Sequence, residues 1–75
     1  MVDHRQVLGR NVNARRKALG LSQEQLGFET KIDRTYISGI ERGVRNPSLM
    51  MIARIAERLG RTPADLLKSE TGTTR

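Results

Sequence analysis

The segment between residues 21 and 47 most constrains what this 75-residue chain can fold into, because it holds two short helical patterns separated by a break. Ser22 and Gln25 have the spacing of a capping box, so they predict the start of one helix. After the break, Asp33 can accept backbone hydrogen bonds at the start of a second helix, and Gly43 ends it. The sequence therefore predicts two consecutive short helices joined by a tight turn.

The second helix of this pair has one apolar and one polar face. Ile37 and Ile40 are three residues apart, so they share a side that can be buried. A helix over residues 34–42 is about 13 Å long, and the major groove of B-DNA, about 12 Å wide, admits one helix. The pair is a helix-turn-helix that points to DNA. Its free face carries Arg34, Thr35, Ser38 and Arg42.

The chain is strongly basic, with 14 Lys and Arg against 8 Asp and Glu and a formal net charge of +6. A polyanionic partner and a solvated surface that keeps a small protein soluble explain this charge equally well. Placement favours the polyanion, because the cations crowd the first helical segment and flank the second helix of the pair. They are Arg5, Arg10, Arg15, Arg16 and Lys17 in the first group, and Lys31, Arg34, Arg42 and Arg45 in the second.

Composition argues against several other classes of protein. The chain has no cysteine, which removes disulfides and thiolate metal sites and fits a reducing cytosol. No apolar run approaches the roughly 18 residues of a membrane span, and the N-terminus lacks the apolar stretch of a signal peptide. His4 is the only histidine, and the serines have no plausible nearby base. We expect a soluble, cytoplasmic protein that is not an enzyme and needs no metal or cofactor.

Helix signals dominate the rest of the chain, which has one Phe, one Tyr and no alternating β-branched run. Capping signals and apolar spacing predict an all-α domain of five helices over residues 4–68. Residues 69–75 have nothing apolar to bury and are expected to form a flexible tail. The expected helices cover about residues 4–19, 23–30, 34–42 and 49–60, with a short last helix that begins at the Thr62 cap and carries Leu66 and Leu67.

Two further capping boxes and two apolar faces support these boundaries. The boxes pair Asp3 with Gln6 and Thr62 with Asp65. Gly20 supplies the end of the first helix. The apolar face of the first helix is expected to include Val7 or Leu8, Val12, Arg15 or Arg16, and Leu19, and that of the fourth Leu49, Ile52, Ala53, Ala56 and Leu59 or Gly60.

The sequence DRTYISGIERGVRNPS, at residues 33–48, resembles the Xre family, the helix-turn-helix proteins of the Cro and phage-repressor type. The resemblance covers about residues 8–67, nearly the whole chain. It implies a compact lambda-repressor-like fold whose second and third helices form the helix-turn-helix, in a homodimer that binds double-stranded DNA and regulates transcription. The same segment is especially similar to the controller proteins of restriction-modification systems.

The resemblance also assigns roles to individual residues. It implies that Arg34 and Thr35 reach base edges, while Gln23, at the start of the second helix, contacts a phosphate. Arg16 and Glu41 match a pair that forms a buried salt bridge between the first and third helices. The remaining matched positions are Tyr36 and Ser38, near the DNA backbone or the groove wall, and Arg45 and Asn46, in a loop that lies on phosphates.

Three positions depart from what is usual in the family or in a helix. Many members have a small residue such as Ala where this chain has Gly27, and Gly where it has Lys31. A left-handed conformation at Lys31 costs about 1 kcal/mol or more, so the turn can be built differently here. Gly39 lies inside the expected helix over residues 34–42, where glycine is less stable than alanine by about 0.5–1 kcal/mol. Either it lets a backbone or a thymine methyl approach closely, or it is a tolerated weakness.

Several candidate contacts have a plainer alternative. Arg34 can be an ordinary solvated arginine, although its guanidinium suits two hydrogen bonds to guanine, worth about 1–3 kcal/mol of discrimination. Thr35 can cap the helix or touch thymine or phosphate, and the Tyr36 ring can pack against the protein or contact a phosphate. Glu41 is not a DNA contact, because a carboxylate facing DNA would be repelled.

A single helix reads too few base pairs to select a promoter, so we expect two copies on a near-palindromic operator with half-sites about 34 Å apart. Met50 and Met51 are expected in the core or in the dimer contact. No small-molecule effector is evident. The candidate interface residues, whose spacing fits a core equally well, are Ile55, Leu59, Leu66 and Leu67.

Two other functions are compatible with the same fold. An antitoxin or bridging-type module would bind a protein partner, which would then purify with it at fixed stoichiometry. An RNA-binding protein would use the same basic surface, but the scarcity of aromatic residues leaves no stacking platform for unpaired bases.

Overall fold

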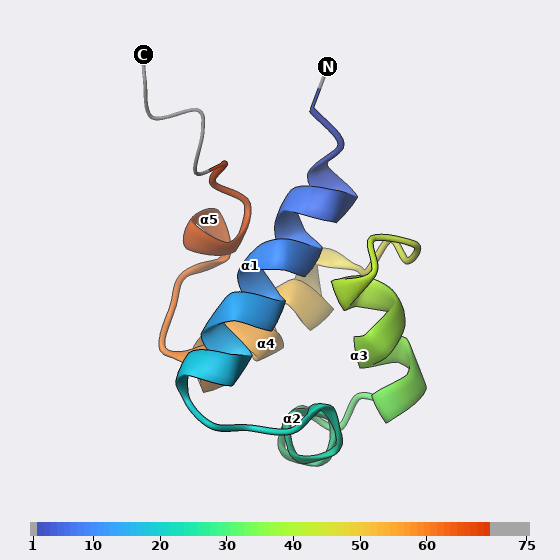
Figure 1. Cartoon of the computed structure of the whole chain (residues 1–75), viewed down its shortest axis with the longest axis vertical. Helices are drawn as coiled ribbons and strands as arrows, with labels where there is room; N and C mark the ends of the chain where they lie inside the picture. The colour runs from blue at the N-terminus through green and yellow to red at the C-terminus, as the bar shows by residue number, and fades with distance from the viewer. Residues whose placement is uncertain (1, 70–75) are drawn as a thin grey trace.

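The computed structural model describes residues 2–69, and within them the chain is all-helical (Figure 1). The predicted five-helix order is confirmed, with boundaries within one or two residues of those expected. The predicted tail lies outside the described residues, except for Ser69. The helices are α1 (His4–Ala18), α2 (Gln23–Thr30), α3 (Arg34–Glu41), α4 (Leu49–Leu59) and α5 (Pro63–Leu66).

A side-chain oxygen caps the N-terminus of each helix, and this explains why the helices begin where they do. The caps are Asp3, Ser22, Asp33, Ser48 and Thr62. Only the box at α5 is closed in both directions. The Asp3 side chain bonds the backbone N–H of the second following residue, and the Gln25 amide of α2 bonds Glu29 instead of the cap. The other two expected boxes are therefore single caps.

All five helices contribute side chains to one apolar core. α1 packs on α3, α4 and α5, and α2 packs on α3 and α4. In Figure 1, α1 crosses the front of the molecule with α4 behind it, α3 on the right and α2 seen end-on below. Each described helix is too short or too polar to span a bilayer. The side chains that are almost completely buried are Val12, Leu26, Ile37, Ile40, Ile55, Leu59 and Leu66.

The structure corrects several expectations about apolar side chains. α1 ends at Ala18, and Leu19 is an exposed C-cap residue outside the apolar face. Leu49 is 70% exposed and does not belong to the buried apolar face of α4. Met50 is exposed as well, which leaves the dimer contact of its two expected places, whereas Met51 packs against the core. Among the candidate interface residues, Ile55, Leu59 and Leu66 have no more than 2% exposure. They fill the core of the single chain and cannot make a dimer contact, which leaves only Leu67 of that set accessible.

The turn between α2 and α3 is built around two unusual backbone positions. Lys31 adopts the left-handed conformation with φ 60°, as its place in the family pattern implies. The backbone N–H of Ile32 then donates to the carbonyl oxygen of Gly27 at 2.9 Å. A Cβ atom on Gly27 would lie 2.5 Å from the carbonyl oxygen of Ile32. Glycine at position 27 thus lets the turn come close to α2, and this turn holds Lys31 in the left-handed conformation.

α1 also crosses α3 at a glycine, and two side chains of α1 hold the C-terminal part of the domain. A Cβ on Gly9 would lie 2.5 Å from the carbonyl oxygen of Ile40. The Asn11 amide donates to the carbonyl oxygens of Leu66 at 2.7 Å and Lys68 at 2.9 Å. α1 is therefore the element that fixes α3 and α5 relative to each other.

Replacing Gly9 by Ala tests this close crossing. Helix propensity alone would raise the free energy of unfolding by about 0.5–1 kcal/mol, whereas the added methyl group forces α1 and α3 apart. We expect the free energy of unfolding to fall by about 1–3 kcal/mol, measured by urea denaturation. Arg10→Ala, at the neighbouring exposed position, should change it by no more than about 0.5 kcal/mol. A more stable Gly9→Ala variant would contradict the crossing.

Candidate nucleic-acid interface

The exposed face of α3 is held outward by the two isoleucines beneath it. Ile37 and Ile40 are completely buried, while Arg34, Thr35 and Arg42 are exposed. The guanidinium of Arg34 makes no hydrogen bond or ion pair within the described residues, so its five N–H donors are available. The predicted separation of an anchored side from a free side is confirmed.

Thr35 takes part in capping α3. Its backbone N–H donates to the Asp33 carboxylate at 2.7 Å, and its hydroxyl donates to the same oxygen. The hydrogen bond from the Thr35 hydroxyl and the one from its N–H hold the pKa of Asp33 below its ordinary value. Because the hydroxyl proton is engaged, Thr35 can offer a partner only its oxygen lone pairs and its methyl group.

Arg45 lies across α3, although it belongs to the following loop. Its guanidinium stands 5.2 Å from the centroid of the Tyr36 ring, a cation–π distance. A Cβ on Gly39 would lie 2.5 Å from Cγ of Arg45. The close approach at Gly39 in this structure is therefore that of the Arg45 side chain. Gly39 itself is buried.

The other predicted contact residues surround this face. Ser38 is half-buried on α3, and Asn46 is exposed in the loop that carries Arg45. Gln23, the first residue of α2, is half-buried and its amide turns inward, donating to Oε1 of Glu41 at 3.0 Å. The structure thus brings all the predicted side chains to α3, the start of α2 and one loop, with Gln23 already engaged in a protein contact.

Glu41 is the acceptor of a buried network that joins three helices. Arg16 donates to it from Nε at 2.6 Å and from a terminal nitrogen at 3.0 Å, which forms the expected salt bridge. Asn13, a residue that the sequence did not single out, donates from Nδ2 at 2.8 Å. Together with Gln23, these groups occupy both oxygens of a side chain that is only 4% exposed.

The electrostatics of this network favour the ionised carboxylate. Burial by itself raises the pKa of Glu41, but the hydrogen bonds from Arg16, Asn13 and Gln23 more than offset it, so the net pKa is lowered. The hydrogen bond to Glu41 likewise raises the pKa of Arg16. Because Arg16 also donates to the carbonyl oxygen of Leu21 at 2.8 Å, it ties the loop before α2 to the same centre.

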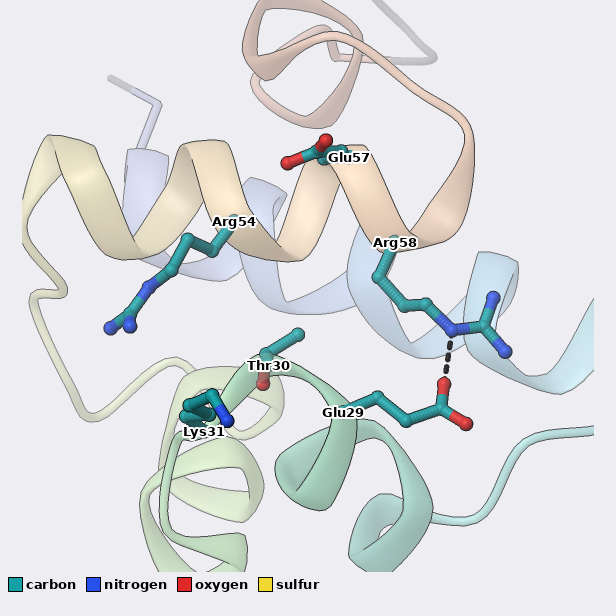
Figure 2. A pocket seen from close by; sticks show the side chains of 6 residues that line it. All are labelled: Glu29, Thr30, Lys31, Arg54, Glu57 and Arg58. Atoms are coloured by element: carbon teal, nitrogen blue, oxygen red, sulfur yellow. Dashed lines mark hydrogen bonds and ion pairs between the residues drawn. The ribbon is translucent and has the colours of Figure 1, made fainter.

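A separate hollow lies between α2 and α4 and contains none of the predicted contact residues (Figure 2). Arg58 of α4 forms an ion pair with Glu29 of α2 at one end of it. Arg54 reaches into the hollow one turn earlier on α4 and makes no hydrogen bond or ion pair among residues 2–69. It is an arginine comparable to Arg34 on a different face of the domain.

Comparison with known proteins agrees with this architecture. Residues 12–66 match the family model described as "Helix-turn-helix". The chain is 55% identical over 51 residues to the control protein C.BamHI of Bacillus amyloliquefaciens, covering 68% of this chain and 63% of that protein, and so spans slightly less than two thirds of its length.

Two solved structures are also similar. The hypothetical transcription factor NHTF from Neisseria superposes with a TM-score of 0.89 at 37% identity, covering 93% of this chain and 79% of that one. The restriction-modification controller protein C.AhdI from Aeromonas hydrophila superposes with a TM-score of 0.79 at 42% identity, covering 83% of this chain and 94% of that one.

The fold and the exposed face of α3 thus define a DNA-binding helix-turn-helix regulator with a compact lambda-repressor-like fold. The chain belongs to the helix-turn-helix family of the Xre type, and its relatives include the control proteins of restriction-modification systems.

Removing one partner of the Glu41 network should strongly destabilise the folded protein. Arg16→Met or Glu41→Gln leaves the other charge buried without compensation, which costs about 3–5 kcal/mol. We expect a loss of that size in urea denaturation at neutral pH.

The same network predicts a pH dependence with a definite sign. The pKa of Glu41 in the folded state lies below its ordinary value of 4.5. Its contribution to stability is therefore complete above that pH and is lost as pH falls through the folded-state pKa. Between pH 5 and pH 3, the wild type should lose more of its free energy of unfolding than Glu41→Gln does. Equal losses would contradict the network as a source of stability.

Proposed function

We propose that the protein is a homodimeric, sequence-specific transcription regulator that lays α3 of each subunit in the major groove of a near-palindromic operator. The observation that supports this most is the guanidinium of Arg34, which has no partner among residues 2–69 and lies on the outer face of a helix whose inner face is fully buried. A rigidly mounted helix with a free bidentate donor suits base recognition. Three of the similar proteins are named as a control protein, a hypothetical transcription factor and a restriction-modification controller protein.

The proposal divides the candidate residues by what they can offer. Arg34 supplies a donor pair for guanine O6 and N7. Thr35 supplies an acceptor for an amino group or a methyl contact with thymine, since its hydroxyl proton bonds Asp33. Phosphate contacts position the helix and carry no sequence information. The candidates for these contacts are Gln23, Tyr36, Ser38, Arg42, Arg45 and Asn46.

The dimer contact is proposed at the start of α4, because three of the four apolar residues expected at the interface are buried within one chain. Leu49 and Met50 are each 70% exposed, and Val44 in the preceding loop is 56% exposed. These three side chains lie just after α3. A two-fold axis near them would place two copies of α3 on the same side of a dimer, as half-sites about one helical turn apart require.

A protein-interaction module is the second candidate function. Phe28 of α2 is 84% exposed, and the proposed contacts with DNA and with a second subunit do not use it. A partner that purifies with the protein at fixed stoichiometry, together with weak and unspecific binding to DNA, would favour this function over operator recognition.

Selection from a pool of random duplexes tests the proposed function. We expect a near-palindromic consensus with half-sites about 34 Å apart. Arg34→Ala should weaken binding to that duplex by about 1–3 kcal/mol and relax the preference at one position in each half-site. Arg54→Ala removes the same charge from the hollow between α2 and α4 and should keep the full preference. An unchanged consensus for Arg34→Ala would contradict the assigned role.

The proposed dimer surface can be tested separately from DNA. The double variant Leu49→Ser and Met50→Ser should weaken dimerisation in sedimentation equilibrium and leave the fold intact, because both side chains are exposed in the single chain. Phe28→Ser, an equally exposed apolar position on α2, serves as the control and should dimerise normally. If the double variant dimerises as strongly as the wild type, the contact lies elsewhere.

A further inference from the structure

We propose that Asn13 and Gln23 form a two-donor cradle for one DNA phosphate, with Glu41 as the positioning residue that turns both amides the required way. This inference rests on the proposed function and adds to it a phosphate-binding residue, Asn13, on α1. Both amide nitrogens lie within 3.0 Å of the same oxygen, Oε1 of Glu41. They come from two different helices and meet beside the third.

The carboxylate determines which end of each amide faces inward. An ionised carboxylate only accepts hydrogen bonds, so it selects the NH2 group of Asn13 and of Gln23 over the carbonyl oxygen. The lowered pKa of Glu41 keeps it ionised at neutral pH. Each NH2 group then has one proton on Glu41 and a second proton that no described group accepts. The second protons of the two neighbouring nitrogens are what an anion could bind.

Exposure and charge are compatible with a phosphate at this place. Asn13 and Gln23 are both half-buried, so each residue keeps part of its surface in contact with solvent while its amide is held by Glu41. The negative charge of Glu41 is balanced by the two hydrogen bonds from Arg16. An incoming phosphate therefore meets oriented N–H donors beside a carboxylate whose charge is balanced by Arg16.

Asn11 provides a matched comparison on the same helix. Its amide has the same chemistry two residues earlier, but both of its protons donate to carbonyl oxygens, those of Leu66 and Lys68. It has no proton left for a ligand. Comparing variants at Asn11 and Asn13 therefore separates two effects: the loss of a free amide proton, and the loss of any asparagine on α1.

The test uses the full chain and a two-turn duplex of mixed sequence at low salt, where phosphate contacts dominate the affinity. Asn13→Ala and Gln23→Ala should each weaken binding about tenfold, as expected for a hydrogen bond to a charged group. Asn11→Ala should bind with wild-type affinity at a temperature well below its unfolding transition. Thermal unfolding of each variant confirms that it is folded under these conditions.

A measurement on the wild-type protein separates a phosphate contact from a purely structural effect. In a 15N-labelled sample, one side-chain amide proton of Asn13 and one of Gln23 should shift on adding the duplex, while those of Asn11 stay in place. Weaker binding by the variants without these shifts would overturn the inference, and so would wild-type affinity in Asn13→Ala. A protein that does not bind the duplex at all would overturn both the inference and the proposed function.

Discussion

The position of α3 depends on the hydrogen bonds that the buried carboxylate of Glu41 accepts. α3 is eight residues long, too short to be stable by itself. Its last residue is held by donors from α1 and α2, through Asn13, Arg16 and Gln23. A small domain has little hydrophobic surface with which to replace such a contact. The network therefore fixes the angle at which α3 is presented as well as its stability.

The two sides of α3 differ in their neighbours: the inner side packs in the core, and the outer side is covered in part by the following loop. Ile37 and Ile40 fill the core, and Gly9 of α1 allows the backbones to come close enough to bury them. On the outer side, the absence of a side chain at Gly39 lets Arg45 lie across the helix against Tyr36. The loop that follows α3 thus folds back onto the helix, and the two form one continuous surface.

Local signals in the sequence were sufficient to predict the helices, because caps and apolar spacing act within a few residues. Ser22, Asp33 and Thr62 cap the helices whose starts they predict. The role of Asn13 gave no such signal, since its partner is 28 residues away and nothing near it in sequence marks the contact. The position of Arg45 over Gly39 also depends on how the loop folds back.

Apolar spacing alone could not distinguish a core from an interface. Ile55 and Leu59 are four residues apart on α4, a spacing that suits either use, and the packing of α1 and α5 on α4 decides in favour of the core. Leu49 and Met50 lie at the start of the same helix, beyond the reach of these neighbours, and stay exposed. The accessible apolar surface is thus set by tertiary packing.

Methylation interference tests whether Arg34 reads a guanine from the outer face of α3. Methylating guanine N7 at one position in each selected half-site should abolish binding of the wild-type protein, because N7 is one of the two acceptors for the guanidinium. The same methylation should cost Arg34→Ala nothing further, since that variant has already lost the contact. Equal interference in the two proteins would mean that Arg34 does not contact this guanine.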